Sequence, residues 1–140
     1  ETLYGDINEV AGDILATVDG AKCPEGIYIF GGEPTVQLPD NPGEGGRNQG
    51  LALELARRIS GRSDLSILVA GTDGSDGVSA GAGAIVDGQS FSAADGAEDA
   101  ISLANSGAFF RVTGVQLVTG PTGTNVMDLV IVHRRTRASA

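Results

Sequence analysis

The chain has 140 residues, which suits one domain of ordinary size, and 41% of them are hydrophobic, enough for a buried core. Its formal net charge of −9 argues against nonspecific nucleic-acid binding, and no apolar run approaches the roughly 18 residues needed to span a membrane. The single cysteine, Cys23, rules out an internal disulfide and, with no signal-peptide pattern visible, favours a reducing, cytoplasmic location.

The first predicted element is an N-terminal helix. Residues 3–18 carry apolar side chains at helical spacing, and Gly20 can end the helix that this spacing predicts. A short strand is expected over residues 27–30. A tight glycine turn should then lead into a second strand, 35–38, paired with the first as a hairpin.

The middle of the chain predicts a second helix followed by a buried strand. Residues 48–60 place leucines and an isoleucine on one helical face, and Asn48 is a possible N-cap. Residues 65–70 are too apolar to alternate, which is typical of a strand buried on both faces.

The last third predicts shorter elements. We expect a short strand, a short helix, a further helical turn and two final strands, over residues 84–86, 97–104, 107–112, 115–118 and 129–133. Strands that alternate with helices predict an α/β layered domain with a mixed β-sheet flanked by helices. The domain is expected to span 1–135, with 136–140 a disordered tail.

Three glycine-rich polar turns are the candidate binding elements. The first contains Gly45 and Gly46, which allow close approach to the backbone, and opens the helix at Arg47 and Asn48. Amide groups at a helix N-terminus attract anions, and the planar guanidinium can hold a carboxylate or phosphate with two hydrogen bonds. The alternative is an ordinary loop with a solvent-exposed arginine.

The second turn, Gly71–Gly77, directly follows the buried strand. Ligands of α/β sheets bind beyond the carboxyl ends of such strands. Asp73 could accept a proton from a substrate hydroxyl, and Asp73 and Asp76 could share a Mg²⁺ ion. The alternative is a pair of local turns in which each aspartate binds its own backbone.

The third turn, Gly120–Asp128, stands between the last two strands. Thr122, Thr124 and Asn125 offer neutral hydrogen-bonding groups, and Asp128 offers an acceptor. The alternative is a hairpin connection, although nine residues is long for one. After the 27–30 strand, Glu33 is either a site carboxylate or part of a solvated turn.

Four segments together support a family resemblance. They are Gly31–Val36, Gly45–Gln49, Ala70–Gly77 and Gly120–Asp128, in this order and spacing. Over roughly residues 1–135 the chain resembles the C-terminal MOFRL domain of the GckA/TtuD-type glycerate 2-kinases, whose members are often labelled hydroxypyruvate reductases. The family usually has threonine, glutamate and asparagine at three positions where this chain has Pro34, Gly50 and Met127.

The resemblance implies a two-domain enzyme in which ATP, with Mg²⁺, phosphorylates the 2-hydroxyl of D-glycerate. An N-terminal Rossmann-like domain, missing from this chain, would face this domain across a cleft. The implied catalytic residues are Arg47 and Asp73, and Asp76 is the implied metal ligand. The implied substrate- or phosphate-binding residues are Gly45, Gly46, Asn48, Thr72, Thr122, Thr124, Asn125 and Asp128.

The chain begins at Glu1 without an initiator methionine, so we expect a piece of a longer polypeptide that is inactive alone. A homodimer is left open. One alternative function is an NAD(P)-dependent hydroxypyruvate reductase, although no Gly-x-Gly-x-x-Gly follows a strand here. The other alternative is a non-catalytic module that binds a small anion.

Overall fold

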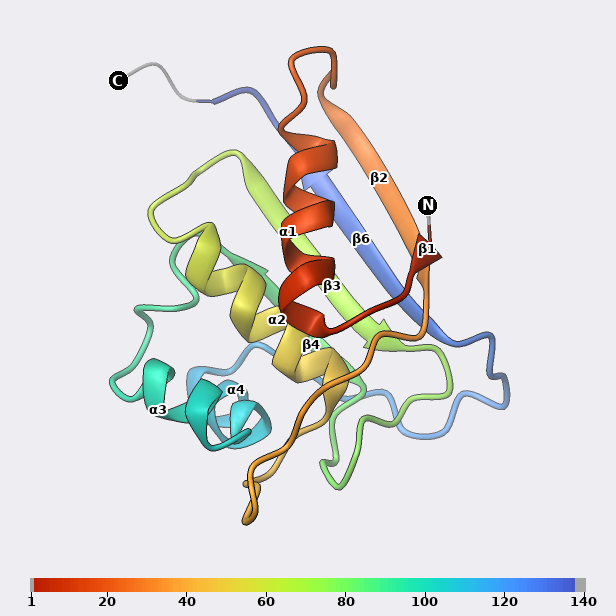
Figure 1. Ribbon diagram of the computed structural model, residues 1–140, viewed down its shortest axis with the longest axis vertical. Helices are drawn as coiled ribbons and strands as arrows, with labels where there is room; N and C mark the ends of the chain where they lie inside the picture. The colour runs from red at the N-terminus through yellow and green to blue at the C-terminus, as the bar shows by residue number, and fades with distance from the viewer. Residues whose placement is uncertain (1, 138–140) are drawn as a thin grey trace.

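Six strands form one sheet in the computed structural model, which describes residues 2–137 (Figure 1). The strands are β1 Thr2–Leu3, β2 Gly26–Gly32, β3 Leu65–Gly71, β4 Gly83–Asp87, β5 Gln116–Leu117 and β6 Asp128–Arg134. In the order β1-β2-β6-β3-β4-β5, β1 and β2 are parallel and all other neighbours are antiparallel. The expected α/β domain with a mixed sheet is confirmed.

The helices found in residues 2–137 are α1 Ile7–Val18, α2 Arg47–Arg58, α3 Ala97–Ser102 and α4 Ser106–Thr113. In Figure 1, α1 and α2 run across the front of the sheet, and α3 and α4 lie beside the lower half of α2. Within this part of the chain, none of them has the length and apolar character needed to cross a membrane.

The core lies between the sheet and these helices. The strand register aligns Phe30, Val130, Val69 and Ala84 in one row across four strands, and all four are buried. The apolar faces of α1 and α2 cover this side of the sheet, because their apolar residues recur at helical spacing. Burying each large aliphatic side chain stabilises the fold by roughly 1.5–3 kcal/mol.

The other face of the sheet also carries an apolar row. Register places Ile29, Ile131, Leu68 and Ile85 side by side there, and Ile29 and Ile85 remain 61% and 48% exposed. A solvated face of an antiparallel sheet normally alternates to polar residues. Both faces of the sheet thus present apolar rows, and the three polar turns lie at the ends of the strands.

Two local predictions about the first third of the chain are wrong in detail. Residues 35–38 are not a strand paired with β2, because β1 and β6 occupy both sides of β2 and only Thr35 makes an isolated bridge, to Asp6. The first helix begins at Ile7 and is capped by Asp6, whose Oδ1 accepts from the amide of Asn8 at 2.9 Å.

The last two strands exist as predicted, but they do not pair. β3 and β4 separate β5 from β6, so the 118–127 connection crosses the ends of both strands. That path explains its length and excludes a hairpin. Near the C-terminus, Thr136 donates to Glu25 and Arg137 pairs with Asp64, while 138–140 of the predicted tail lie outside the described residues.

Candidate functional site

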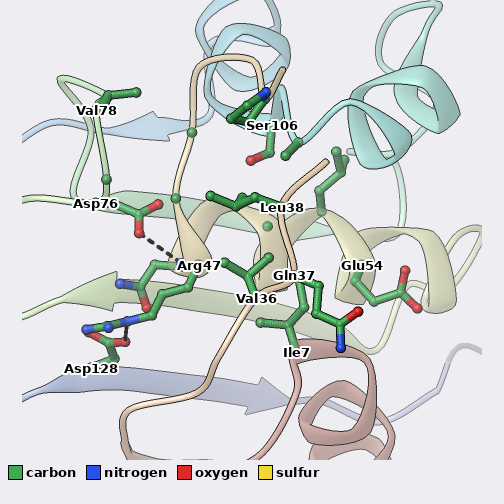
Figure 2. A pocket seen from close by; sticks show the side chains of 18 of the residues that line it. Ile7, Val36, Gln37, Leu38, Arg47, Glu54, Asp76, Val78, Ser106 and Asp128 are labelled. Carbon is green, nitrogen blue, oxygen red and sulfur yellow. Dashed lines mark hydrogen bonds and ion pairs between the residues drawn. The ribbon is translucent and has the colours of Figure 1, made fainter. Parts of the chain in front are cut away.

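A cleft of about 800 Å³ opens at the end of the sheet where β2 and β3 finish and β6 begins. Its lining comes from the start of α1, the irregular 33–46 segment, the first turns of α2, the turn after β3, α3 with the start of α4, and the segment before β6. Figure 2 shows Arg47, Asp76 and Asp128 gathered at one end, with Val36 and Leu38 beside them. The cleft therefore has a charged end and an apolar side.

Arg47 is held by two carboxylates. Its Nε donates to Asp128 Oδ2 at 2.5 Å and its Nη2 donates to Asp128 Oδ1 at 3.1 Å (Figure 2). Its Nη1 donates to Glu33 Oε1 at 3.0 Å. The hydrogen bonds to Asp128 raise the pKa of Arg47 above its ordinary value, although partial burial opposes the shift. The guanidinium carries five N–H groups, and these contacts use three.

Asp76 occupies the N-terminus of α2. Its Oδ1 accepts from the amide of Asn48 at 2.9 Å, and its Oδ2 accepts from the amide and the Nε2 of Gln49 at 2.8 and 3.1 Å. Gly46 is the N-cap, and a Cβ there would lie 2.4 Å from Asp76 Oδ1, so only glycine leaves room for this cap. The anion expected at this helix end is thus the protein's own carboxylate.

Burial raises the pKa of Asp76 above the ordinary aspartate value, while the helix amides oppose the shift. Both of its oxygens are engaged, which disfavours the predicted metal role, although that role stays a prediction. Among residues 2–137 no three histidine, cysteine, aspartate or glutamate side chains gather as a metal site. Asp73, half-buried, keeps a carboxylate at the cleft, where its Oδ1 accepts from the Ser75 amide at 3.0 Å.

Asn48 is not the N-cap that the sequence suggested, because Gly46 is the N-cap and Asn48 is the second residue of α2. Its side chain is buried, with 1% of the residue exposed, and it lines the cleft. Its Oδ1 is the one buried side-chain polar atom without a hydrogen-bond partner in the described part of the chain. Such an atom needs an explanation, since buried acceptors are nearly always paired.

The second and third turns are joined to each other by threonines. Thr72 Oγ1 donates to the carbonyl of Met127 at 2.7 Å and accepts from the Val126 amide at 2.9 Å. In the other direction, Thr122 Oγ1 donates to the carbonyl of Thr72, and the Thr122 amide donates to the carbonyl of Asp73 at 3.2 Å. Both hydroxyls therefore hold the two loops together, and neither threonine lines the cleft.

The candidate residues divide into two groups. The cleft is lined by the predicted residues Gly45, Gly46, Arg47, Asn48, Asp73, Asp76, Asn125 and Asp128, whereas Thr72, Thr122 and Thr124 are absent from its lining. Glu33, left open from sequence, joins the site through Arg47.

Sequence reasoning missed the apolar side of the cleft, which includes Ile7, Val36, Leu38, Ala100 and Ile101. Two of these belong to the 33–46 segment, whose alternating pattern resembled a strand. A signal for them was available in the two prolines that flank residues 35–38, Pro34 and Pro39, since proline is unfavourable in a paired strand.

The fold and the site together define an α/β domain that presents a charged, glycine-lined cleft at the ends of its strands. Residues 26–128 match the model of the MOFRL family, so the chain belongs to that family. The domain resemblance expected from the four polar segments is confirmed.

Comparison with individual proteins supports the same family. A D-glycerate 2-kinase of Thermotoga maritima is 45% identical over 107 residues, covering 74% of this chain and 25% of the relative. A glycerate kinase of Homo sapiens is 48% identical over 140 residues, covering 92% and 26%. A crystal structure of glycerate kinase from Thermotoga maritima superposes with a TM-score of 0.85 and 34% identity, over 96% of this chain and 34% of that one. The chain spans about a quarter of the length of these two curated kinases.

Proposed function

We propose that this domain forms one wall of the active-site cleft of a glycerate 2-kinase, which transfers a phosphoryl group from ATP to the 2-hydroxyl of D-glycerate. The observation that carries the proposal is the charged end of the cleft. Arg47, Asp128 and Asp76 meet there at the strand ends, on a fold similar to that of glycerate kinase.

Arg47 is the proposed anion-binding group. Two of its five N–H groups make no contact within residues 2–137, and its side chain is 34% exposed. Because Asp128 and Glu33 already orient the guanidinium, a carboxylate or a transferring phosphate meets a preorganised donor pair. Phosphoryl transfer depends mainly on such positioning and on charge neutralisation.

Asp73 is the proposed acceptor of the hydroxyl proton, because it keeps a carboxylate at the cleft on a turn after β3. Mg²⁺ bound to the nucleotide would neutralise the phosphate charge, and Mg²⁺ commonly takes only one or two protein carboxylates. The acidic lining of the cleft is compatible with that cation. The Asp76 oxygens already accept from the amides of α2 and from the Gln49 side chain, so as a ligand Asp76 would share them between these donors and the metal ion.

The test uses the protein expressed from its whole gene, with D-glycerate, ATP and Mg²⁺, and measures ADP formation. We expect activity in the wild type and a loss of kcat/KM on the order of 10²–10³-fold in Arg47→Ala. Arg111→Ala is the matched control, since Arg111 pairs with Glu44 and does not line the cleft. The control should stay within about twofold of wild type.

Circular dichroism checks that Arg47→Ala still folds, because the change leaves buried Asp128 without its partner. Folded wild type that forms no ADP would refute the kinase proposal. Oxidation of NADH with hydroxypyruvate under the same conditions would instead support the reductase alternative. We expect the 140-residue chain alone to be inactive.

A further inference from the structure

The unpaired oxygen of Asn48 is the starting point. The residue lies in the first turn of the twelve-residue helix α2, lines the cleft and is only 1% exposed. No group within residues 2–137 donates to its Oδ1. Leaving a buried acceptor unpaired costs stability, so the carbonyl is best explained by a donor that comes from outside the domain.

The two ends of the Asn48 amide have different surroundings. A Cβ added to Gly71 would lie 3.3 Å from Asn48 Nδ2, 3.1 Å from Asp73 Oδ1 and 2.6 Å from the carbonyl oxygen of Ser75. The amide nitrogen thus lies toward the Gly71 turn, on the side of two acceptors, the Asp73 carboxylate and the Ser75 carbonyl. The oxygen, Oδ1, is the buried atom of this amide that no donor within residues 2–137 reaches.

The charges around Asn48 limit the kind of ligand group. The backbone amides of Asn48 itself and of Gln49 already bind the Asp76 carboxylate, so a second anion at this helix end would face it directly. Asp73 and Asp128 add negative charge nearby in the lining. A carboxylate or phosphate is disfavoured at the Asn48 carbonyl, whereas a group that donates a proton is favoured.

Arg47 and Asn48 are consecutive residues in the first turn of one helix, and they offer complementary groups. The free N–H groups of Arg47 suit a carboxylate, and the Asn48 carbonyl suits a hydroxyl. Gly45, Gly46 and Gly50 also line the cleft here and present no side chain that blocks a small ligand.

We infer that Asn48 Oδ1 accepts a hydrogen bond from a hydroxyl group of a hydroxy acid whose carboxylate is bound by Arg47, which makes Asn48 a specificity-determining residue. The inference rests on the proposed function, because it assigns one end of that function's substrate. It predicts discrimination between acids that have the hydroxyl and acids that lack it.

The test is calorimetric titration of the whole-gene protein with four acids that differ only in hydroxyls: D-glycerate, D-lactate, 3-hydroxypropanoate and propanoate. In the wild type, removal of the hydroxyl that Asn48 reads should weaken binding by about tenfold or more, since an unpaired buried acceptor remains. In Asn48→Ala, D-glycerate and the acid lacking that hydroxyl should bind within about twofold of each other.

Gln37→Ala is the matched control, because Gln37 is a second cleft-lining amide and is exposed (Figure 2). The control should retain the wild-type discrimination. If Asn48→Ala does not fold by circular dichroism, Asn48→Leu keeps the branched side-chain shape and still lacks the acceptor. D-serine, with an ammonium group in place of the 2-hydroxyl, should not bind better than D-glycerate.

Equal binding of all four acids to folded wild type, or unchanged discrimination in the Asn48 variant, would overturn the inference. Tighter binding of D-serine would overturn it in favour of an ammonium site. The readout is binding and does not need phosphoryl transfer. Hydroxyl-dependent binding without ADP formation would therefore refute the kinase and leave the role of Asn48 standing.

Discussion

At the scale of single residues, Met127 is the clearest strain in the loop that crosses the strand ends. Its φ of +73° lies in the left-handed region, which a methionine occupies at a cost of about 1–2 kcal/mol, whereas asparagine adopts it more readily. We therefore expect Met127→Asn, the residue usual in the family, to raise the free energy of unfolding by about 0.5–1 kcal/mol in urea titrations.

The matched control is Val126→Asn. Val126 is the exposed neighbour of Met127, and it is not one of the described residues with a positive φ. It should bring no gain in stability. If Met127→Asn proves no more stable than wild type, then the weak contact of the Met127 sulfur with the Tyr4 hydroxyl, at 3.9 Å, contributes more than the backbone strain costs.

At the scale of elements, α2 depends on Asp76, a carboxylate 28 residues beyond the first amide that it caps. Asp76→Ala removes three hydrogen bonds and leaves buried helix amides unpaired, so we expect a loss of about 2–3 kcal/mol in chemical unfolding. Asp73→Ala, on the same turn, loses only local bonds to Ser75 and should cost under about 1 kcal/mol. Equal losses of unfolding free energy in the two variants would contradict the capping role of Asp76.

At the scale of the whole molecule, a buried charge joins distant parts of the chain. Asp64, only 1% exposed, accepts from Arg62 and from Arg137, and Arg62 also pairs with Asp19 at the end of α1. Hydrogen bonds from Arg62 hold the pKa of Asp64 well below its ordinary value of 3.8. The folded-state pKa is lowered, so the stabilisation is complete above pH 3.8 and is lost as the pH falls toward the folded-state pKa.

We accordingly expect Asp64→Asn to lower the free energy of unfolding by about 2 kcal/mol at pH 7, measured in urea. The difference from wild type should shrink as the pH is lowered below 3.8, because the unfolded wild type then takes up a proton at Asp64 while the folded state still holds the carboxylate ionised. Asp19→Asn is the control and should cost less, since Asp19 is 35% exposed. A difference that does not change with pH would rule out this explanation.

Local sequence patterns predicted where the helices and strands lie better than they predicted which strands pair. The unbroken apolar run of β3 and the helical spacing in α1 and α2 were sufficient to place those elements within a few residues. The 35–38 strand was wrong because pairing is decided by distant residues. β6, about 100 residues further on, supplies seven register positions for β2, and no nearby segment competes with it.

The site shows the same division. The three polar turns were identifiable because glycine, threonine and aspartate gather only where the backbone leaves regular structure. Their roles were not identifiable, because Thr72 and Thr122 are used to join two loops and Asp76 is used to cap a helix. Those uses depend on which loops the strand order brings together.

The residue pattern alone thus determined the class of fold, the family and the set of polar turns, since these depend on spacing along the chain. Only the folded sheet decided which of these side chains are already satisfied by the protein. Inserting β6 between β2 and β3 brings Asp128 against Arg47 and carries the third turn across to the second. After that assembly, the Asn48 carbonyl is the buried side-chain acceptor that residues 2–137 leave without a donor.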